Sequence, residues 1–318
     1  MRIVLLDSFA ADQGDSARPE LRAIGELVVY PRTPPNLVLE RSAGAQALLT
    51  NKVVLSAELM AALPDLRYVG VTATGTNVVD LDAAKQRNIA VTNVPAYSTE
   101  SVAQLVFAMV LHFAFDITGH DAAVKAGRWA SGPDFCFFLH PLREMAGKTL
   151  VVVGMGAIGN AVTRIATAFG MKVIAAQVPG SSSTNRTSLD EALPLADVVT
   201  LHCPLTPATR GLVDRRFLAA LKPNAILINT SRGPVVDETA LQESLRAGSL
   251  GGVGLDVLGA EPPTPGHPLL DPAAPWAARL VVTPHLGWGT VEARKRLATC
   301  VAANLAAFVA GQQLNRIV

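Results

Sequence analysis

Three glycines near the middle of the chain have a spacing that suits the binding of phosphate groups. Gly154, Gly156 and Gly159 form the pattern G-x-G-x-x-G between an aliphatic run, Leu150–Val153, and a run with helical periodicity, Asn160–Phe169. A turn of this kind brings bare backbone N–H groups and a helix N-terminus up to a pyrophosphate. The pattern predicts a dinucleotide site, although a structural turn in another type of α/β domain would also use such glycines.

The residue that follows the next predicted strand, Lys172–Ala176, bears on the choice of cofactor. An NAD-selective site usually has Asp or Glu there to bond the ribose 2′-hydroxyl, whereas this chain has Gln177. Glutamine can bond the hydroxyl without repelling a 2′-phosphate, and Ser181, Ser182, Ser183 and Arg186 follow closely enough to bind such a phosphate. A solvated serine-rich loop explains the same residues. The sequence therefore leaves both NAD and NADP open.

An arginine, a carboxylate and a histidine follow later strands of the same predicted sheet. They are Arg232, Glu261 and His285, and we expect them to converge because ligands of open α/β sheets lie beyond the carboxyl ends of the strands. Arg232 can grip a 2-oxo acid in a planar fork, while His285 can give a proton to the carbonyl oxygen as hydride reaches the carbon. Glu261 can hold the other imidazole N–H and favour the charged ring. A loop ion pair, a surface carboxylate and a strand-end histidine are the structural alternatives.

These segments together resemble the D-2-hydroxyacid dehydrogenase family over essentially the whole chain. The segments that carry the resemblance are the glycine turn, His202–Thr209, Ile228–Asp237, Leu255–Val257 with Glu261, and Thr283–His285. The resemblance implies that Arg232, Glu261 and His285 are catalytic. It implies cofactor contacts from Thr99, Gly154, Gly156, Ala157, Ile158, Gly159, Gln177, Cys203, Pro204, Thr209, Thr230, Ser231, Asp256 and Gly287. It implies substrate contacts from Lys52, Thr74, Gly75 and Trp288.

Within the family, four segments look most like those of glycerate dehydrogenases, which are also called hydroxypyruvate reductases. They are Leu49–Val53, Thr72–Asn77, Tyr97–Val102 and Pro284–Trp288. This likeness implies the NAD(P)-dependent reduction of hydroxypyruvate to D-glycerate, and of glyoxylate to glycolate. The alternatives are a dehydrogenase for another D-2-hydroxy acid, lactate-like or phosphorylated, and a dinucleotide-sensing binding protein similar to the corepressor relatives of the family.

Length, charge and cysteine content narrow the class of protein. A chain of 318 residues is long enough for two domains, each with its own core. The charges balance, with 27 Lys and Arg against 26 Asp and Glu, so neither nucleic acid nor a membrane surface is an expected partner. Three separated cysteines fit a reducing compartment, here the cytoplasm, and lack zinc-ligand spacing, so no metal site is expected. The N-terminus begins as a strand rather than as a signal peptide.

Strand and helix patterns alternate along the chain, which predicts the elements that must position these residues. The expected fold class is α/β, with two Rossmann-like doubly wound parallel-sheet domains: a flavodoxin-like substrate domain and a dinucleotide-binding domain. The family implies an interdomain cleft between them. We expect residues 1–97 and 288–318 in the substrate domain and 98–287 in the other. Val102–Ile117 reads as one buried helix, and the last helix, Val291–Val309, should pack back on the substrate domain.

An aromatic stretch with no clear periodicity precedes the dinucleotide-binding pattern. It contains Trp129, Phe135, Phe137 and Phe138. On an isolated surface these side chains would promote aggregation, so burial against another subunit is the better explanation. We therefore expect residues 128–147 to be the arm of a homodimer, with an intrachain clamp as the alternative.

Overall fold

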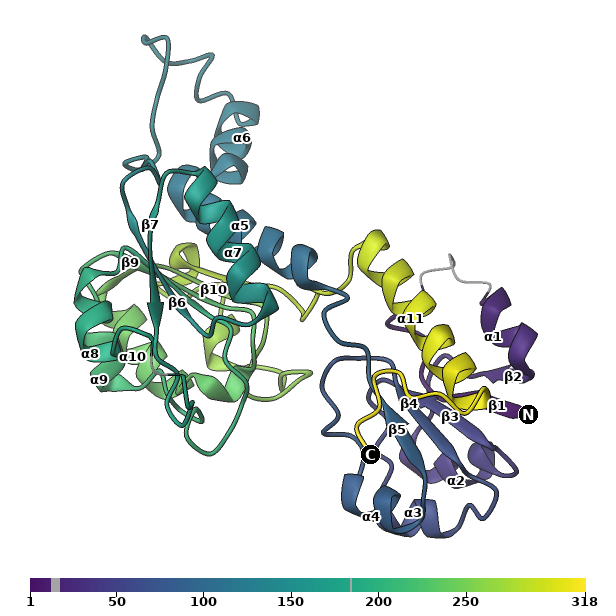
Figure 1. Cartoon of the computed structure of the whole chain (residues 1–318). Helices are drawn as coiled ribbons and strands as arrows, with labels where there is room; N and C mark the ends of the chain where they lie inside the picture. Colours follow the sequence, from purple (N-terminus) through teal and green to yellow (C-terminus); the bar gives the residue numbers. More distant parts are fainter. Residues whose placement is uncertain (13–17, 184) are drawn as a thin grey trace. The chain divides into compact units, whose positions relative to one another are not determined.

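The chain divides into two compact units in the computed structural model, which describes residues 1–12, 18–183 and 185–318 (Figure 1). The first unit contains Met1–Ser98 and Trp288–Val318, and the second contains Thr99–Gly287. Each unit has one parallel sheet with helices on both faces. The first unit is thus built from two separate segments of the chain.

The sheet of the first unit has five parallel strands in the order β2-β1-β3-β4-β5. The strands are β1 (Arg2–Leu5), β2 (Glu26–Val29), β3 (Ala47–Thr50), β4 (Tyr68–Val71) and β5 (Ala90–Thr92). The helices are α1 (Pro19–Ile24), α2 (Val38–Ser42), α3 (Ala57–Ala61), α4 (Leu81–Gln86) and α11 (Val291–Val309). A 2-1-3-4-5 order is that of flavodoxin-like folds, which confirms the predicted fold class for this unit.

Alternate residues of these strands face opposite sides of the sheet and form two separate cores. Val4 and Val69 pack on the side covered by α2, α3 and α4. Ile3 and Tyr68 face the other side, where they pack with α1 and with Leu297 of the C-terminal helix α11. Because helices cover both faces, the strands are apolar at consecutive positions rather than at every second one.

The sheet of the second unit has six parallel strands in the order β11-β10-β9-β8-β6-β7. The strands are β6 (Thr149–Val153), β7 (Lys172–Ala176), β8 (Val198–Leu201), β9 (Ala225–Asn229), β10 (Leu250–Leu255) and β11 (Leu280–Val282). The helices are α5 (Thr99–Phe115), α6 (Ile117–Lys125), α7 (Ala157–Ala168), α8 (Leu189–Ala192), α9 (Arg215–Ala219) and α10 (Glu238–Ala247). The chain passes from β6 to β7 on one side and then returns to β8 on the other. The carboxyl ends of β6 and β8 therefore form the switch point at which such sheets bind ligands.

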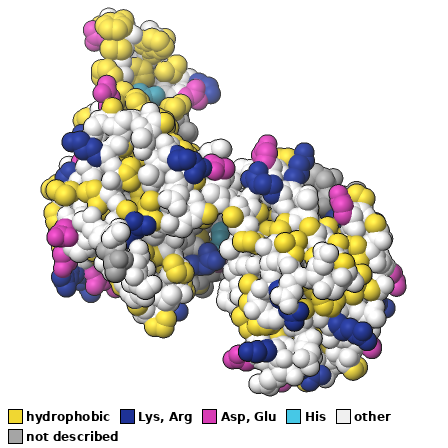
Figure 2. Space-filling view, viewed as in Figure 1, with side chains coloured by type: hydrophobic (Ala, Val, Ile, Leu, Met, Phe, Trp, Pro, Cys, Tyr) yellow, Lys and Arg dark blue, Asp and Glu magenta, His cyan; other side chains and the backbone are white. Residues whose placement is uncertain are grey.

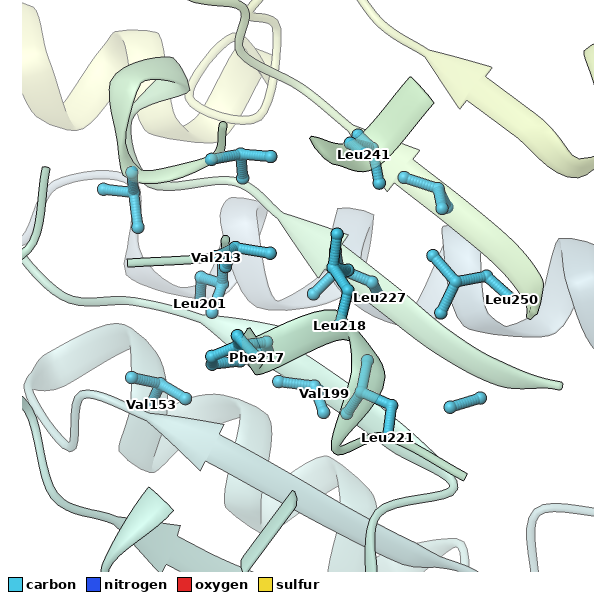
Figure 3. Packing of buried hydrophobic residues seen from close by; sticks show 14 of the residues in the cluster. Val153, Val199, Leu201, Val213, Phe217, Leu218, Leu221, Leu227, Leu241 and Leu250 are labelled. Carbon is cyan, nitrogen blue, oxygen red and sulfur yellow. The ribbon is translucent and has the colours of Figure 1, made fainter. Parts of the chain in front are cut away.

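Two cores also hold the second unit together. On one face of the sheet, Val199 and Leu227 pack with Phe217 and Leu218 of α9, as Figure 3 shows. On the other face, Val152 belongs to a core that includes residues of α5 and α7. The strand ends that must carry a site are thus fixed from both sides.

The expected single helix Val102–Ile117 is wrong at its C-terminal end. α5 ends at Phe115, and Asp116 takes a left-handed conformation (φ 43°) in which its side chain accepts the Gly119 N–H at 3.0 Å and caps α6. Ile117 is consequently 74% exposed rather than buried. Among the described residues, no single helix is long and apolar enough to cross a membrane, and α5 with α6 meets that test only as a pair bent by 52°.

The segment that follows α6 projects from the body of the second unit (Figure 1). We call residues 128–147 the arm. Phe135 is 88% exposed, Phe138 62% and Trp129 51%, and hydrophobic side chains cover much of this projection in Figure 2. The aromatic residues of the arm thus lie outside both cores of the unit.

Candidate active site

The glycine turn lies at the switch point of the second sheet. Gly154 follows β6 with φ +107°, and a Cβ there would come within 2.7 Å of the Cys203 nitrogen, so glycine lets the ends of β6 and β8 approach each other. Gly156 is the N-cap of α7, and no side chain among the described residues caps that helix. Apart from its chain neighbours and its own helix backbone, no atom of the part of the chain that the structure describes lies within 4 Å of a Cβ built on Gly156. An uncapped helix N-terminus with open space in front of it fits a pyrophosphate.

The turn after β9 presents Arg232 and is organised by a buried amide. Asn229 accepts hydrogen bonds from the N–H (3.0 Å) and the hydroxyl (2.8 Å) of Ser231, and its Nδ2 donates to the Arg232 carbonyl at 3.0 Å. No sequence pattern predicted this role of Asn229, although an amide that ends an otherwise apolar strand was the available signal. Thr230 has a buried hydroxyl with no partner among the described residues, which also fits a bound ligand at this edge.

The loop after β8 is shaped by its own side chains. The Thr209 hydroxyl donates to the Pro204 carbonyl at 2.6 Å and accepts the Thr206 N–H at 2.8 Å. Cys203 is buried, and burial raises the pKa of its thiol to about 11, so the thiol stays protonated at neutral pH. Of the residues expected to contact cofactor here, Pro204 is exposed while Cys203 and Thr209 are buried.

His285 and Glu261 form a direct pair, as the chemistry of a proton donor requires. His285 Nδ1 lies 2.6 Å from Glu261 Oε2, and the two side chains are 30% and 33% exposed. The other carboxylate oxygen of Glu261 accepts the Leu258 N–H at 3.2 Å. Because an ionised carboxylate can only accept, Nδ1 carries a proton and Nε2 is the nitrogen that can exchange one with a substrate.

A buried carboxylate holds the loop that carries His285. Asp256 Oδ1 accepts the Thr283 hydroxyl at 2.6 Å and the Leu286 N–H at 2.9 Å, while Oδ2 accepts the Gly287 N–H at 2.9 Å. These bonds flank His285 on both sides, and its own φ of 52° is an uncommon one for a residue other than glycine. Asp256 therefore positions the histidine through the backbone of this loop.

Arg232 lies in a loop that packs against the segment leading to Glu261. A Cβ on Gly233 would come within 1.9 Å of the Leu258 carbonyl oxygen, so the two loops touch through their backbones. The guanidinium is exposed and donates to the Ser231 carbonyl at 2.7 Å. The three residues expected to be catalytic thus lie in loops at the carboxyl edge of one sheet.

Comparisons with known proteins decide the family. The family model "D-isomer specific 2-hydroxyacid dehydrogenase, NAD binding domain" matches residues 107–287. The chain is 39% identical to the hydroxypyruvate reductase of Blautia hydrogenotrophica over 99% of each chain. The chain belongs to the D-2-hydroxyacid dehydrogenase family. As a member of this oxidoreductase family, it has a nicotinamide dinucleotide as its cofactor class.

Two further relatives of this 2-hydroxyacid dehydrogenase bear on its activity. The glycerate dehydrogenase of Methylorubrum extorquens is 40% identical over 88% of each chain. A crystal structure of the NADPH-dependent glyoxylate/hydroxypyruvate reductase of Sinorhizobium meliloti, in complex with NADP and malonate, superimposes with a TM-score of 0.81 at 28% identity. The match covers 100% of this chain and 96% of the other.

In the first unit of the dehydrogenase, the residues expected to contact substrate lie in loops after strands. Lys52 follows β3, and its backbone N–H donates to the carboxylate of Asp7, whose pKa is raised by burial. Thr74 and Gly75 follow β4, and the Thr74 hydroxyl donates to a backbone carbonyl at 2.9 Å. Trp288 is half-buried against the core that contains α11.

The end of β7 brings Arg186 close to Gln177 along the backbone. The Gln177 N–H donates to the Thr187 carbonyl at 2.8 Å, and the Thr187 N–H donates to the Ala175 carbonyl at 3.0 Å. These bonds place Thr187 beside the strand end, so its neighbour Arg186 lies close to Gln177 along the backbone, with an exposed side chain. Of the other expected cofactor contacts, Thr99 begins α5, and Ala157 and Ile158 begin α7.

Proposed function

We propose that this dehydrogenase reduces hydroxypyruvate to D-glycerate, and glyoxylate to glycolate, in the cytoplasm. The observation that carries the proposal is the 2.6 Å pair of His285 and Glu261 at the same sheet edge as the glycine turn. Relatives named hydroxypyruvate reductase and glycerate dehydrogenase support the choice of substrate. Three free cysteines support a reducing compartment.

In this proposal His285 acts as the general acid. When bound, a nicotinamide dinucleotide would supply the hydride for the substrate carbonyl carbon. Nε2 of His285 gives its proton to the carbonyl oxygen, and in the reverse direction it takes that proton back. Glu261 stays on Nδ1 throughout, where its negative charge stabilises the imidazolium and fixes the direction in which Nε2 points. Glu261 is thus a positioning residue, whereas His285 touches the reacting atoms.

Arg232 has the geometry and the charge to hold the substrate. Its guanidinium forms no ion pair with any described residue, so its charge is not neutralised within the chain. Two of its N–H groups can bind a carboxylate oxygen and the carbonyl oxygen of a 2-oxo acid together, which also polarises the carbonyl. Lys52, Thr74, Gly75 and Trp288 complete the proposed set of substrate contacts.

For the cofactor, we propose that the site accepts NADPH as well as NADH. Gln177 brings no negative charge to the end of β7, and its backbone bond to Thr187 supports a position for Arg186 close by. A 2′-phosphate therefore meets no repulsion from residue 177 and has a cation on the same loop. A Gln177→Asp variant should shift the preference towards NADH, because aspartate bonds the 2′-hydroxyl and repels the phosphate.

The test is the initial rate of hydroxypyruvate reduction with NADH and with NADPH, followed by the loss of nicotinamide absorbance. We expect turnover with hydroxypyruvate and with glyoxylate. Protein that binds cofactor but turns over only D-lactate-like or phosphorylated acids would refute the substrate assignment and keep the reaction type. Cofactor binding without turnover of any 2-oxo acid would instead favour a dinucleotide-sensing protein.

A further inference from the structure

Three side chains at the base of the arm form a cluster that the reaction does not use. Asp116 precedes α6, His120 lies one turn further along it, and His140 belongs to the arm. One ligand atom of each side chain lies within 4.8 Å of those of the other two. Asp116 Oδ2 and His140 Nε2 are 3.6 Å apart. Two residues separated by a helical turn thus meet a third that is twenty positions away.

Both imidazoles are oriented with one nitrogen against the backbone. His120 Nδ1 lies 2.9 Å from the Asp116 carbonyl oxygen, and His140 Nδ1 lies 3.3 Å from the Pro141 carbonyl oxygen. Because a carbonyl only accepts, a proton on each Nδ1 satisfies these contacts and leaves the Nε2 lone pair for an ion. This arrangement is typical of histidines that bind metals, in which the second nitrogen donates to a backbone carbonyl or a carboxylate.

The surroundings restrain the cluster further. Asp116 Oδ1 is occupied by the Gly119 N–H, which leaves Oδ2 as the oxygen that faces the histidines. The ring of His120 stacks on Phe137 with centroids 6.0 Å apart and meets His140 edge-on at 5.6 Å. All three side chains are half-buried. They are therefore held in place, yet a small ion can reach them.

We propose that Asp116, His120 and His140 bind one Zn²⁺ ion, with water in the fourth position. Two imidazole nitrogens and one carboxylate oxygen form a ligand set that zinc prefers and that magnesium and calcium do not. Zinc bonds of about 2.0–2.2 Å place tetrahedral ligand atoms roughly 3.3 Å apart, close to the 3.6 Å already found for Asp116 and His140. His120 Nε2 gives up its 3.3 Å bond from the Leu139 N–H to join them.

The ion would connect the start of α6 to the returning segment of the arm. In its absence, the described residues link His140 to α6 through the 3.6 Å contact with Asp116 and the ring contact with His120. Three metal bonds are stronger and more directional than these contacts. Zinc binding should therefore order the arm without any change in the candidate active site.

Calorimetry on the metal-free full-length protein tests the proposal. We expect one Zn²⁺ per chain and no heat from Mg²⁺. His120→Gln and His140→Gln should each weaken zinc binding at least about a hundredfold, since loss of a direct ligand exceeds the 10–100-fold effect of losing its supporting partner. His112→Gln, on the adjacent helix, and Cys136→Ser, in the arm, are the matched controls and should bind as the wild type does. Circular dichroism and cofactor binding verify that each variant folds.

X-ray absorption at the zinc edge gives a second test that needs no variant. Two imidazoles with oxygen ligands and no sulfur are expected for the wild-type protein. A sulfur ligand would assign the ion to Cys136 or another cysteine and overturn the proposal. No stoichiometric zinc binding, or binding that both histidine variants retain, would overturn it as well, and the cluster would then be an ion pair only.

Discussion

His285 is placed by two carboxylates that act in different ways. Glu261 contacts the ring itself, whereas Asp256 holds the backbone on either side of the histidine. A general acid must keep its proton on the correct nitrogen and must keep its ring pointing towards the substrate. Glu261 supplies the first restraint through the ring, and Asp256 supplies the second through the backbone. Within the same unit, His267 and Glu238 form a similar pair, with Nε2 and Oε2 3.2 Å apart. Among the described residues, no buried carboxylate holds the backbone on both sides of His267 as Asp256 does for His285.

We predict that His285→Ala lowers kcat for hydroxypyruvate by at least about a hundredfold, the usual scale for loss of a general acid. Cofactor affinity should stay within about twofold, because the change lies outside the glycine turn. The measurement is steady-state kinetics together with cofactor titration by fluorescence. His267→Gln is the matched control, since it breaks a His–Glu pair of the same kind and should keep its turnover. Equal losses in both variants would show a general structural effect rather than proton transfer.

A second histidine makes a prediction about stability and pH. Burial lowers the pKa of His202 to about 4, and its Nε2 lies 2.9 Å from the Thr200 hydroxyl. The unfolded chain therefore binds more protons than the folded chain between about pH 6.5 and 4. The free energy of unfolding is therefore highest, with respect to this group, above pH 6.5. It falls as the pH falls, by about 2 kcal/mol between pH 7.5 and 5.

The check is urea unfolding of the wild type and of His202→Gln at both pH values. Glutamine keeps a polar group near Thr200 but cannot take up a proton. The wild type should lose more unfolding free energy on acidification than the variant does, by about the amount given by linkage. A loss of the same size in both proteins would assign the acid sensitivity to other groups.

Substitution by alanine should affect stability differently at Gly159, within α7, and at Gly156, the N-cap of the same helix. A Cβ on Gly159 would lie 2.1 Å from the Gly154 carbonyl oxygen, whereas a Cβ on Gly156 meets no atom of another described segment within 4 Å. Gly159→Ala must push α7 away from the turn, and overpacking of this kind typically costs about 1–3 kcal/mol of stability. Gly156→Ala should leave the unfolding free energy within about 0.5 kcal/mol, as at an uncrowded surface position.

The same two variants distinguish an effect on stability from an effect on cofactor binding. Because the alanine methyl of Gly156→Ala fills the space before the helix N-terminus, we expect cofactor affinity to fall by at least tenfold, about 1.4 kcal/mol. Thermal unfolding and cofactor titration of both variants provide the measurements. If Gly156→Ala binds cofactor as tightly as the wild type, the pyrophosphate does not lie at this helix.

The sequence predicts elements well where the signal is local. The predicted strand Lys172–Ala176 coincides with β7 because it is a short apolar run after a glycine, Gly170, that has a left-handed φ of 72°. The break at Asp116 has only a weak local signal, because Ile117 extends the apolar run one residue past it and the cap is a single side chain. The contact of His140 with α6 depends on the path of a loop that has no periodicity, so no local pattern could predict it.

For the whole molecule, the parallel sheets explain why so many residues of the candidate site can be predicted from the sequence. Every strand of a parallel sheet ends at the same edge, so residues after successive strands, such as Arg232 and His285, gather there whatever the details of the loops. The strand pattern does not predict which residues hold the loops at that edge in place. Asn229 and Asp256 work through hydrogen bonds to neighbouring loops, and such partners appear only when the loops are folded.

The arm carries the last prediction, which concerns assembly. We propose that it forms the contact of a homodimer, because Phe135 and Phe138 are 88% and 62% exposed and lie on a segment that projects from its unit. A Phe135→Ser, Phe138→Ser double variant should sediment at the 33.3 kDa of one chain, and the wild type at twice that mass at micromolar concentration.

Leu195→Ser is the matched control for this experiment. It removes a hydrophobic side chain of comparable exposure, 51%, that lies outside the arm, and it should leave the mass of the wild-type assembly unchanged. Since exposed apolar surface favours association wherever it is large and continuous, only a difference between the two sites would assign the contact to the arm. A wild type that sediments as a monomer would contradict the proposal, and so would a double variant that remains dimeric.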